Sequence, residues 1–193
     1  MLKLFKQDGW DVVGLEPNVG MCRYAESEFG IEIIPTILEK AELEDRSADA
    51  VLMMHALEHV SDPYSTLKEV YRILKPGGIF VMETPRYDTL MFKLLGKRER
   101  SLNCDGHIYF FTTRTLEKIA TKAGFTVLKT DYVGRSLTLD RVFSVLGAIG
   151  KSQLIQKILK DVAVKLLLNK ISLSLNVRDI QRIYLKKPDS ASA

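Results

Sequence analysis

Apolar and polar positions alternate most regularly between residues 49 and 85. A short apolar run, Ala50 to Met54, precedes a polar turn, and Asp62-Pro63 suits the cap and first position of a helix. Apolar residues then recur at helical spacing: Leu67, Val70, Tyr71 and Leu74. Pro76-Gly77-Gly78 stops the helix before a second apolar run, Ile79 to Met82. The pattern predicts a βαβ unit whose parallel strands are both central in a sheet, the first buried on both faces.

The same signals predict elements on both sides of this unit. In chain order they are the end of a helix over residues 1–7, strand 10–15, helix 18–29 capped by Asn18 and ended by Gly30, strand 31–34, helix 113–123 capped by Thr113 and ended by Gly124, strand 125–133, a helical segment within 134–176, and strand 177–186. Strands alternating with helices are typical of α/β folds.

Composition indicates one ordinary globular domain. The chain has 193 residues, 46% hydrophobic and 27% charged, and no apolar run approaches the roughly 20 residues that a membrane span requires. The N-terminus lacks a signal-peptide core, so we expect a cytoplasmic protein. Two cysteines, Cys22 and Cys104, make no disulfide framework.

The net charge of +4 is unevenly distributed. Residues 1–134 hold 17 Lys and Arg against 20 Asp and Glu, whereas residues 135–187 hold 11 against 3. Within the basic part, residues 151–169 combine a wide apolar stripe with lysines on the other face. Such a helix packs as a lid, joins a partner or makes peripheral contact with a membrane; solvated lysines on an ordinary helix are the simpler alternative.

Two blocks of the chain resemble class I S-adenosylmethionine-dependent methyltransferases. The string DAVLMMHALEHVSDPYSTLKEVYRILKPGGIFVMETP is similar to the middle of that family, in which a strand ends in a turn reading roughly LEHV, followed by Asp-Pro, a helix and LKPGG. The segment GHIYFFTTRTLEKIATKAGFTV resembles a second block. The resemblance implies a three-layer, mostly parallel Rossmann-like sheet in one domain, residues 1–187, with a helical insertion or lid at 135–176 before a last antiparallel strand. Residues 188–193 are expected to be a disordered tail.

The resemblance also implies S-adenosylmethionine as the cofactor. It places Glu16, followed by Pro17, where a strand-end acid accepts hydrogen bonds from ribose hydroxyls. Met54, His55 and Ala56 stand at the carboxyl end of a later strand and would line the open side of the cofactor, and Glu39 would hold the adenine edge. Glu42 suits the adenine edge equally, and a solvated acidic loop explains both residues as well. No G-x-G-x-G is present, so the chain reads as an N-terminally truncated member of the family or as a variant.

For the reaction, the resemblance implies O-methylation of a small molecule or glycan. His107 has the chemistry of a general base for an acceptor hydroxyl, although a histidine that orients its loop fits equally. Pro85, Arg86 and Tyr109 would face the substrate. A degenerate, non-catalytic binding module is the main alternative, and a nicotinamide enzyme ranks last. We expect no nucleic-acid partner, and the sequence leaves the oligomeric state open.

One local motif points to a metal. His55-Ala56-Leu57-Glu58-His59 matches the H-x-x-E-H zinc motif of a protease class, which needs a helix to bring both histidines onto one ion. Here the preceding run is strand-like and a new helix starts at Asp62, while Cys104 and His107 together are too sparse for a site. The sequence therefore predicts no metal, with Glu58 and His59 holding the turn through backbone hydrogen bonds.

Overall fold

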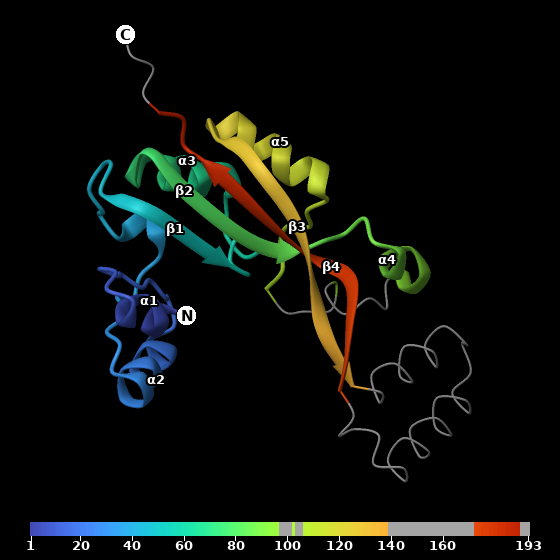
Figure 1. Ribbon diagram of the computed structural model, residues 1–193, viewed down its shortest axis with the longest axis horizontal. Coiled ribbons are helices and arrows are strands. Elements are labelled where there is room, and N and C mark those ends of the chain that lie inside the picture. The colour runs from blue at the N-terminus through green and yellow to red at the C-terminus, as the bar shows by residue number, and fades with distance from the viewer. Residues whose placement is uncertain (97–101, 103–105, 139–171, 190–193) are drawn as a thin grey trace.

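The computed structural model describes residues 1–96, 102, 106–138 and 172–189 of the chain (Figure 1). The elements, in chain order, are α1 Leu2–Gln7, α2 Val19–Phe29, the 3-10 helix η1 Leu38–Lys40, β1 Ala48–Met54, α3 Pro63–Ile73, β2 Leu74–Pro85, α4 Leu90–Leu95, α5 Thr113–Ala123, β3 Thr126–Thr138 and β4 Ser172–Lys186. Helices and strands alternate through most of this order, so the predicted α/β class is confirmed.

The sheet has the strand order β1-β2-β4-β3. β1 and β2 run parallel, and β4 is antiparallel to both of its neighbours, β2 and β3. The predicted βαβ unit is therefore present, and the last strand is antiparallel as expected. Because β1 and β2 are parallel, their carboxyl ends lie at the same edge of the sheet.

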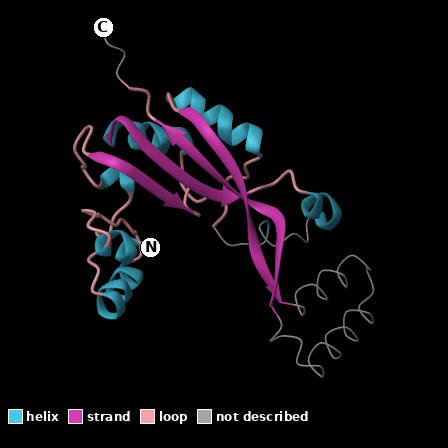
Figure 2. Cartoon of the chain, viewed as in Figure 1, coloured by secondary structure: helices cyan, strands magenta, loops and turns pink. Residues whose placement is uncertain are grey.

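The core lies between the sheet and two helices, α3 and α5, which pack against each other and the strands (Figure 2). Phe80 and Met82 of β2 are fully buried, whereas Ile79 and Val81 are only partly buried. This alternation follows from the two-residue period of a strand, which points successive side chains to opposite faces. The rest of the buried cluster is Leu57, Leu67, Val70, Leu74, Phe111, Leu116, Ala120, Ala123, Phe125, Ile183 and Leu185.

Helix ends follow the predicted capping residues in most cases. Asn18 and Asp62 accept backbone hydrogen bonds at the starts of α2 and α3, and Gly30 ends α2 in the left-handed conformation. The predicted cap of α5 was wrong by one residue, because Thr112 and not Thr113 forms the capping box with Thr115.

Helix α3 ends earlier than the sequence pattern predicted. Its last residue is Ile73, and the segment from Leu74 to Gly78 already belongs to β2. A proline disfavours the helical conformation of the residue before it, so Pro76 pushes Lys75 into extended backbone. The helix therefore ends before the Pro-Gly-Gly sequence and not at it.

Two predicted N-terminal strands are reduced to a single parallel bridge. Leu15 pairs with Ile34, supported by hydrogen bonds from Glu16 N to the Ile34 carbonyl (3.2 Å) and from Ile34 N to the Gly14 carbonyl (2.9 Å). Ile34 is 44% exposed, so this pair buries little apolar surface. In the described part of the chain these two short segments pair with no third strand, and they do not form a regular ladder.

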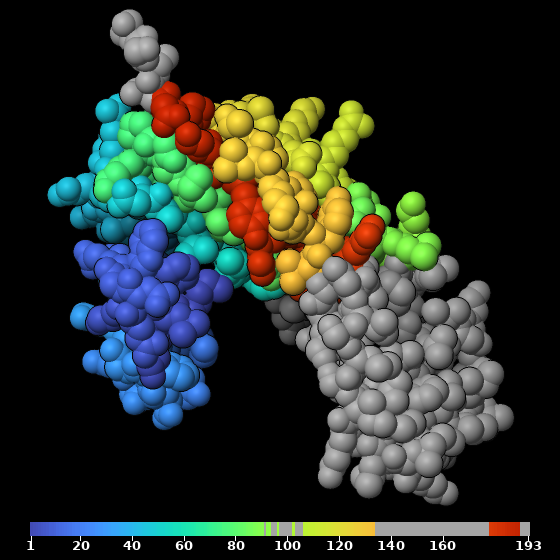
Figure 3. Space-filling model, viewed as in Figure 1, coloured from blue at the N-terminus to red at the C-terminus, as the bar shows by residue number. Residues whose placement is uncertain are grey.

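β1 occupies the edge of the sheet, which corrects the prediction that it is central and buried on both faces. Leu52 is 39% exposed, and within the described part of the chain β1 pairs only with β2. Figure 3 shows the N-terminal residues as a lobe on the side of β1. The apolar run was read correctly as a strand, but its burial depends on neighbours that the run itself does not specify.

The antiparallel pair β3–β4 is longer than predicted. Arg135 pairs with Leu175 and Thr138 with Ser172, so residues 135–138 and 172–176 are strand rather than helical insertion. The rest of the predicted insertion, including the basic segment 151–169, lies outside the described residues, as does the end of the tail, 190–193. No helix in the described part of the chain is long and apolar enough to cross a membrane.

Candidate active site at the strand ends

The turn after β1 is anchored to the neighbouring strand. His55 adopts a positive φ of 51°, uncommon for a residue with a side chain, and its backbone N donates to the Glu83 carbonyl at 2.8 Å. The His55 ring lies between two acids, with Nδ1 3.4 Å from Glu58 Oε1 and Nε2 3.2 Å from Glu83 Oε1. The turn is not helical, as predicted from its flanking residues.

Glu58 is a buried carboxylate in this turn, with an exposed fraction of 1%. The Thr84 hydroxyl donates to its Oε2 at 2.9 Å. Burial by itself raises the pKa of Glu58, but hydrogen bonds from His55, from its own backbone and from Thr84 outweigh burial and hold the pKa below its ordinary value. Glu58 is therefore ionised at neutral pH in a site that excludes water.

The turn is also joined to the segment before α5. The Glu58 carbonyl accepts hydrogen bonds from Ile108 N (2.9 Å) and Tyr109 N (3.1 Å). His59 Nδ1 lies 2.8 Å from the Gly106 carbonyl oxygen, and the rings of His59 and His107 are 4.7 Å apart, edge to face. The predicted backbone hydrogen bonds of Glu58 and His59 are confirmed, and they tie the turn to residues almost 50 positions later.

Glu83 forms the second acidic position at this edge. Arg182 of β4 lies directly opposite it and contacts its Oε2 through Nε (2.8 Å) and a terminal nitrogen (2.7 Å). Arg182 was not predicted from the sequence. β4 also contains Arg178, Asp179 and Lys186, so a charge in this strand becomes informative only once the register with β2 is known.

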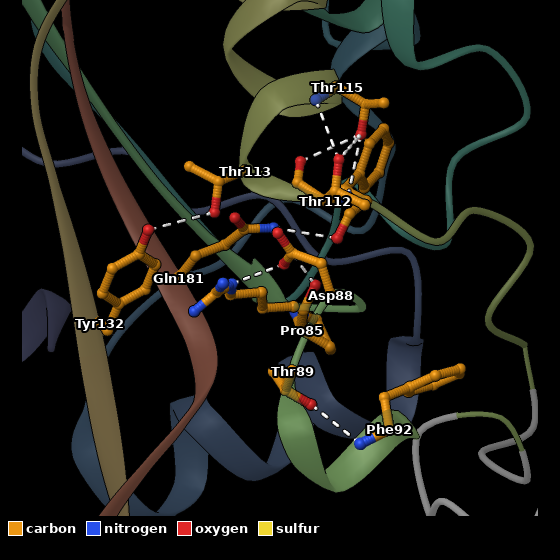
Figure 4. Close-up of polar contacts among 11 residues, drawn as sticks. Pro85, Asp88, Thr89, Phe92, Thr112, Thr113, Thr115, Tyr132 and Gln181 are labelled. Atoms are coloured by element: carbon orange, nitrogen blue, oxygen red, sulfur yellow. Dashed lines mark hydrogen bonds and ion pairs between the residues drawn. The ribbon is translucent and has the colours of Figure 1, made fainter. Parts of the chain in front are cut away.

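Arg86 follows β2, and its guanidinium is held by two neighbours. Its Nε donates to Asp88 at 2.6 Å, and its guanidinium carbon lies 4.4 Å from the centre of the Tyr132 ring. Figure 4 shows this region, in which Tyr132 faces Thr113 and Thr89 caps α4. The same view shows the buried Gln181, whose Nε2 donates to the Phe111 carbonyl at 3.2 Å.

A family model described as a methyltransferase domain matches residues 1–130. The chain belongs to this methyltransferase family. O-methyltransferase 3 from Dictyostelium discoideum is 31% identical over 120 residues, which cover 57% of this chain and 26% of the relative. A ubiquinone biosynthesis O-methyltransferase from Psychrobacter arcticus is 35% identical over 92 residues, covering 45% and 35%. This methyltransferase chain thus spans only about a quarter to a third of those relatives.

The fold agrees with that of solved methyltransferases. A SAM-dependent methyltransferase from Archaeoglobus fulgidus superposes with a TM-score of 0.64 at 21% identity, covering 96% of this chain and 80% of that one. Methyltransferases of this family and fold use S-adenosylmethionine as the methyl donor. The chemistry of Glu16 fits the ribose of this cofactor: Asn18 N donates to Oε1 at 2.8 Å, which leaves Oε2 as an acceptor for hydroxyls.

The other predicted site residues of the methyltransferase fall into separate groups. Met54, His55 and Ala56 lie at the carboxyl end of β1. The turn that follows also holds His59, whose ring packs against the ring of His107. Glu39 of η1 instead accepts the Thr66 hydroxyl of α3. The remaining positions are an exposed Pro17, a buried Pro85, and Tyr109, whose hydroxyl donates to the Ser61 carbonyl at 3.0 Å.

Proposed function

We propose that this chain carries the methyl-transfer site of an S-adenosylmethionine-dependent O-methyltransferase whose acceptor is a small molecule or a glycan. The observation that carries the proposal is the junction of the turn after β1 with the segment before α5. That junction brings His107 beside His59 at the carboxyl edge of the parallel strands. Ligands of open α/β sheets bind at this edge. Both relatives named above are O-methyltransferases, which supports oxygen as the acceptor.

The bound cofactor supplies a methyl group activated on a sulfonium. This chain has two tasks: to hold the acceptor oxygen in line and to take up its proton. Orientation provides much of the rate of such a transfer, so a rigid edge matters. Rigidity comes from the Glu58–Thr84 hydrogen bond and from the paired Glu83 and Arg182. His107, held next to this edge, is the proposed proton acceptor.

Calorimetric titration with S-adenosylhomocysteine tests whether the cofactor site is formed. A folded sample should show saturable binding, and Glu16→Ala should abolish it by removing the acceptor of the ribose hydroxyls. Glu28→Ala, which removes an exposed acid of α2, is the control and should bind normally. An absence of heat at about millimolar ligand from folded protein would contradict the proposal for this chain and favour a non-catalytic module. An unchanged affinity in Glu16→Ala would refute the ribose assignment alone.

The acceptor class needs a separate measurement. A panel of phenols, sugars and amines, read as S-adenosylhomocysteine released from S-adenosylmethionine, should show turnover with hydroxyl acceptors. His107→Ala should then lower turnover far more than cofactor affinity if His107 takes the proton. Turnover restricted to amines would refute O-methylation while leaving the family assignment intact.

A further inference from the structure

Three side chains at the joined turn form a set typical of metal sites. Glu58 and His59 come from the turn after β1, and His107 comes from the segment before α5. Each offers one ligand atom, and these atoms all lie within 4.8 Å of one another. We propose that Glu58, His59 and His107 bind one divalent transition-metal ion. This set differs from the H-x-x-E-H reading of the sequence, because its second histidine is His107 and not His55.

The geometry is close to that of a ligated ion. With metal–nitrogen and metal–oxygen bonds of about 2.0–2.2 Å, a tetrahedral site places its ligand atoms roughly 3.4 Å apart. The three ligand atoms, which lie within 4.8 Å of one another, therefore have to draw together by at most about 1.4 Å, which side-chain rotations can supply. His59 is exposed and His107 half-buried, so both rings have room to adjust.

The hydrogen bond of His59 prepares this ring for a metal. A carbonyl oxygen only accepts, so His59 Nδ1, 2.8 Å from the Gly106 carbonyl, carries the proton. In the neutral ring this leaves the lone pair on Nε2. Histidines that ligate metals commonly donate their other ring N–H to a backbone carbonyl or carboxylate, which fixes the tautomer and the ring orientation. His59 has this arrangement.

The buried charge of Glu58 provides an independent argument. Its Oε1 is buried, and the charged group facing it is the His55 ring, with Nδ1 at 3.4 Å. Arg182 is paired with Glu83, and within the described residues no lysine or arginine pairs with Glu58. A buried carboxylate is costly unless it is paired or coordinates a metal. A divalent ion bound to Glu58 would place a full positive charge beside this buried carboxylate, which His55 alone supplies only when it is protonated.

The donor set selects the class of ion. Two imidazoles and one carboxylate suit Fe²⁺, Co²⁺, Mn²⁺ or Zn²⁺, whereas Mg²⁺ and Ca²⁺ prefer oxygen ligands alone. Three protein ligands leave further coordination positions open. If the proposed O-methyltransferase function holds, on which this step rests, an acceptor oxygen at an open position would be acidified by the ion. His107 would then act as a ligand rather than as the proton acceptor.

Titration with Co²⁺ alone tests the proposal without any cofactor or acceptor. Chelator-treated, dialysed protein, shown to be folded by circular dichroism, is titrated with cobalt chloride and followed by visible absorption and calorimetry. We expect one Co²⁺ per chain. His59→Gln and His107→Gln should each weaken binding by at least about tenfold, because each removes a ligand. Glu58→Gln should do the same, and the two histidine variants keep the test decisive if that buried variant does not fold.

Glu28→Gln is the control, because it changes an exposed acid of α2 outside the proposed set. It should change the Co²⁺ affinity by less than about threefold, because only the ligands and their direct partners control metal affinity strongly. Failure of folded wild-type protein to saturate below about 1 mM Co²⁺ would overturn the proposal. Binding that is lost in His55→Gln but kept in His107→Gln would overturn the ligand assignment. The S-adenosylhomocysteine titration is independent of these results, so failure of the methyltransferase proposal and failure of the metal proposal are distinguishable.

Discussion

Thr84→Val tests the buried hydrogen bond that holds the turn after β1. The substitution keeps the shape of the side chain but removes the hydroxyl that donates to Glu58 Oε2 at 2.9 Å. Glu58 and Thr84 are both 1% exposed, so water cannot replace the lost donor. Hydrogen bonds to charged groups contribute about 1.5–3 kcal/mol, and we expect the free energy of unfolding at pH 7 to fall by about 2 kcal/mol. For a chain of this size that corresponds to a drop in Tm of about 4–8 °C.

The pH dependence of the stability difference distinguishes the loss of the Thr84–Glu58 hydrogen bond from a change in side-chain packing. Because the pKa of Glu58 lies below its ordinary value of 4.5, its ionised form contributes stability above that pH, and the contribution is lost as the pH falls through the native pKa. Thr84 is one of the groups that lower this pKa. The difference between wild-type protein and Thr84→Val should therefore be full at pH 7 and shrink as the pH falls below 4.5 toward the native pKa of Glu58.

Thr84→Ser is the matched control for Thr84→Val. It keeps the hydroxyl and loses one methyl group, so it should cost about 1 kcal/mol with little dependence on pH. Urea unfolding at a series of pH values measures both variants. A Thr84→Val difference that does not shrink as the pH falls below 4.5 would refute the reasoning, since a carboxylate could not then be its source. A Thr84→Ser loss as large as that of Thr84→Val would refute it as well.

Two glycines give further predictions. Gly124→Ala should destabilise the fold by about 1–3 kcal/mol in urea unfolding, because φ is +110° and the added Cβ meets Tyr71 Cε2 at 2.9 Å. Gly106→Ala should displace the His59 ring, seen as shifted imidazole NMR resonances, because its Cβ lies 3.2 Å from His59 Nδ1 at a φ of +87°. Gly9→Ala is the control for both, with a φ of +86° and nothing within 4 Å of the added Cβ. A loss of stability in Gly9→Ala equal to that in Gly124→Ala would contradict the first explanation. Unmoved His59 resonances in Gly106→Ala would contradict the second.

The elements with local signals were predictable from the sequence. Asn18, Asp62, Gly30 and Gly124 cap or end their helices through contacts within a few residues, and the structure confirms all four. Sheet position is different, because it depends on neighbours far along the chain. The run from Ala50 to Met54 is a strand as predicted, yet it lies at an edge. Apolar character alone does not specify which strands flank it.

The site shows the same limit at the level of single residues. The H-x-x-E-H spacing suggests that His55 and His59 act together, which holds only if the segment is a helix. The structure instead divides the motif. A positive φ turns His55 toward Glu83, while His59 meets Gly106, 47 residues later, and the ring of His107. Glu58 lies between His55 on one side and His59 with His107 on the other. Its partners therefore depend on how β1, β2 and the segment before α5 meet. An experiment on the chemistry of Glu58 has to distinguish the effect of His55 from that of His107.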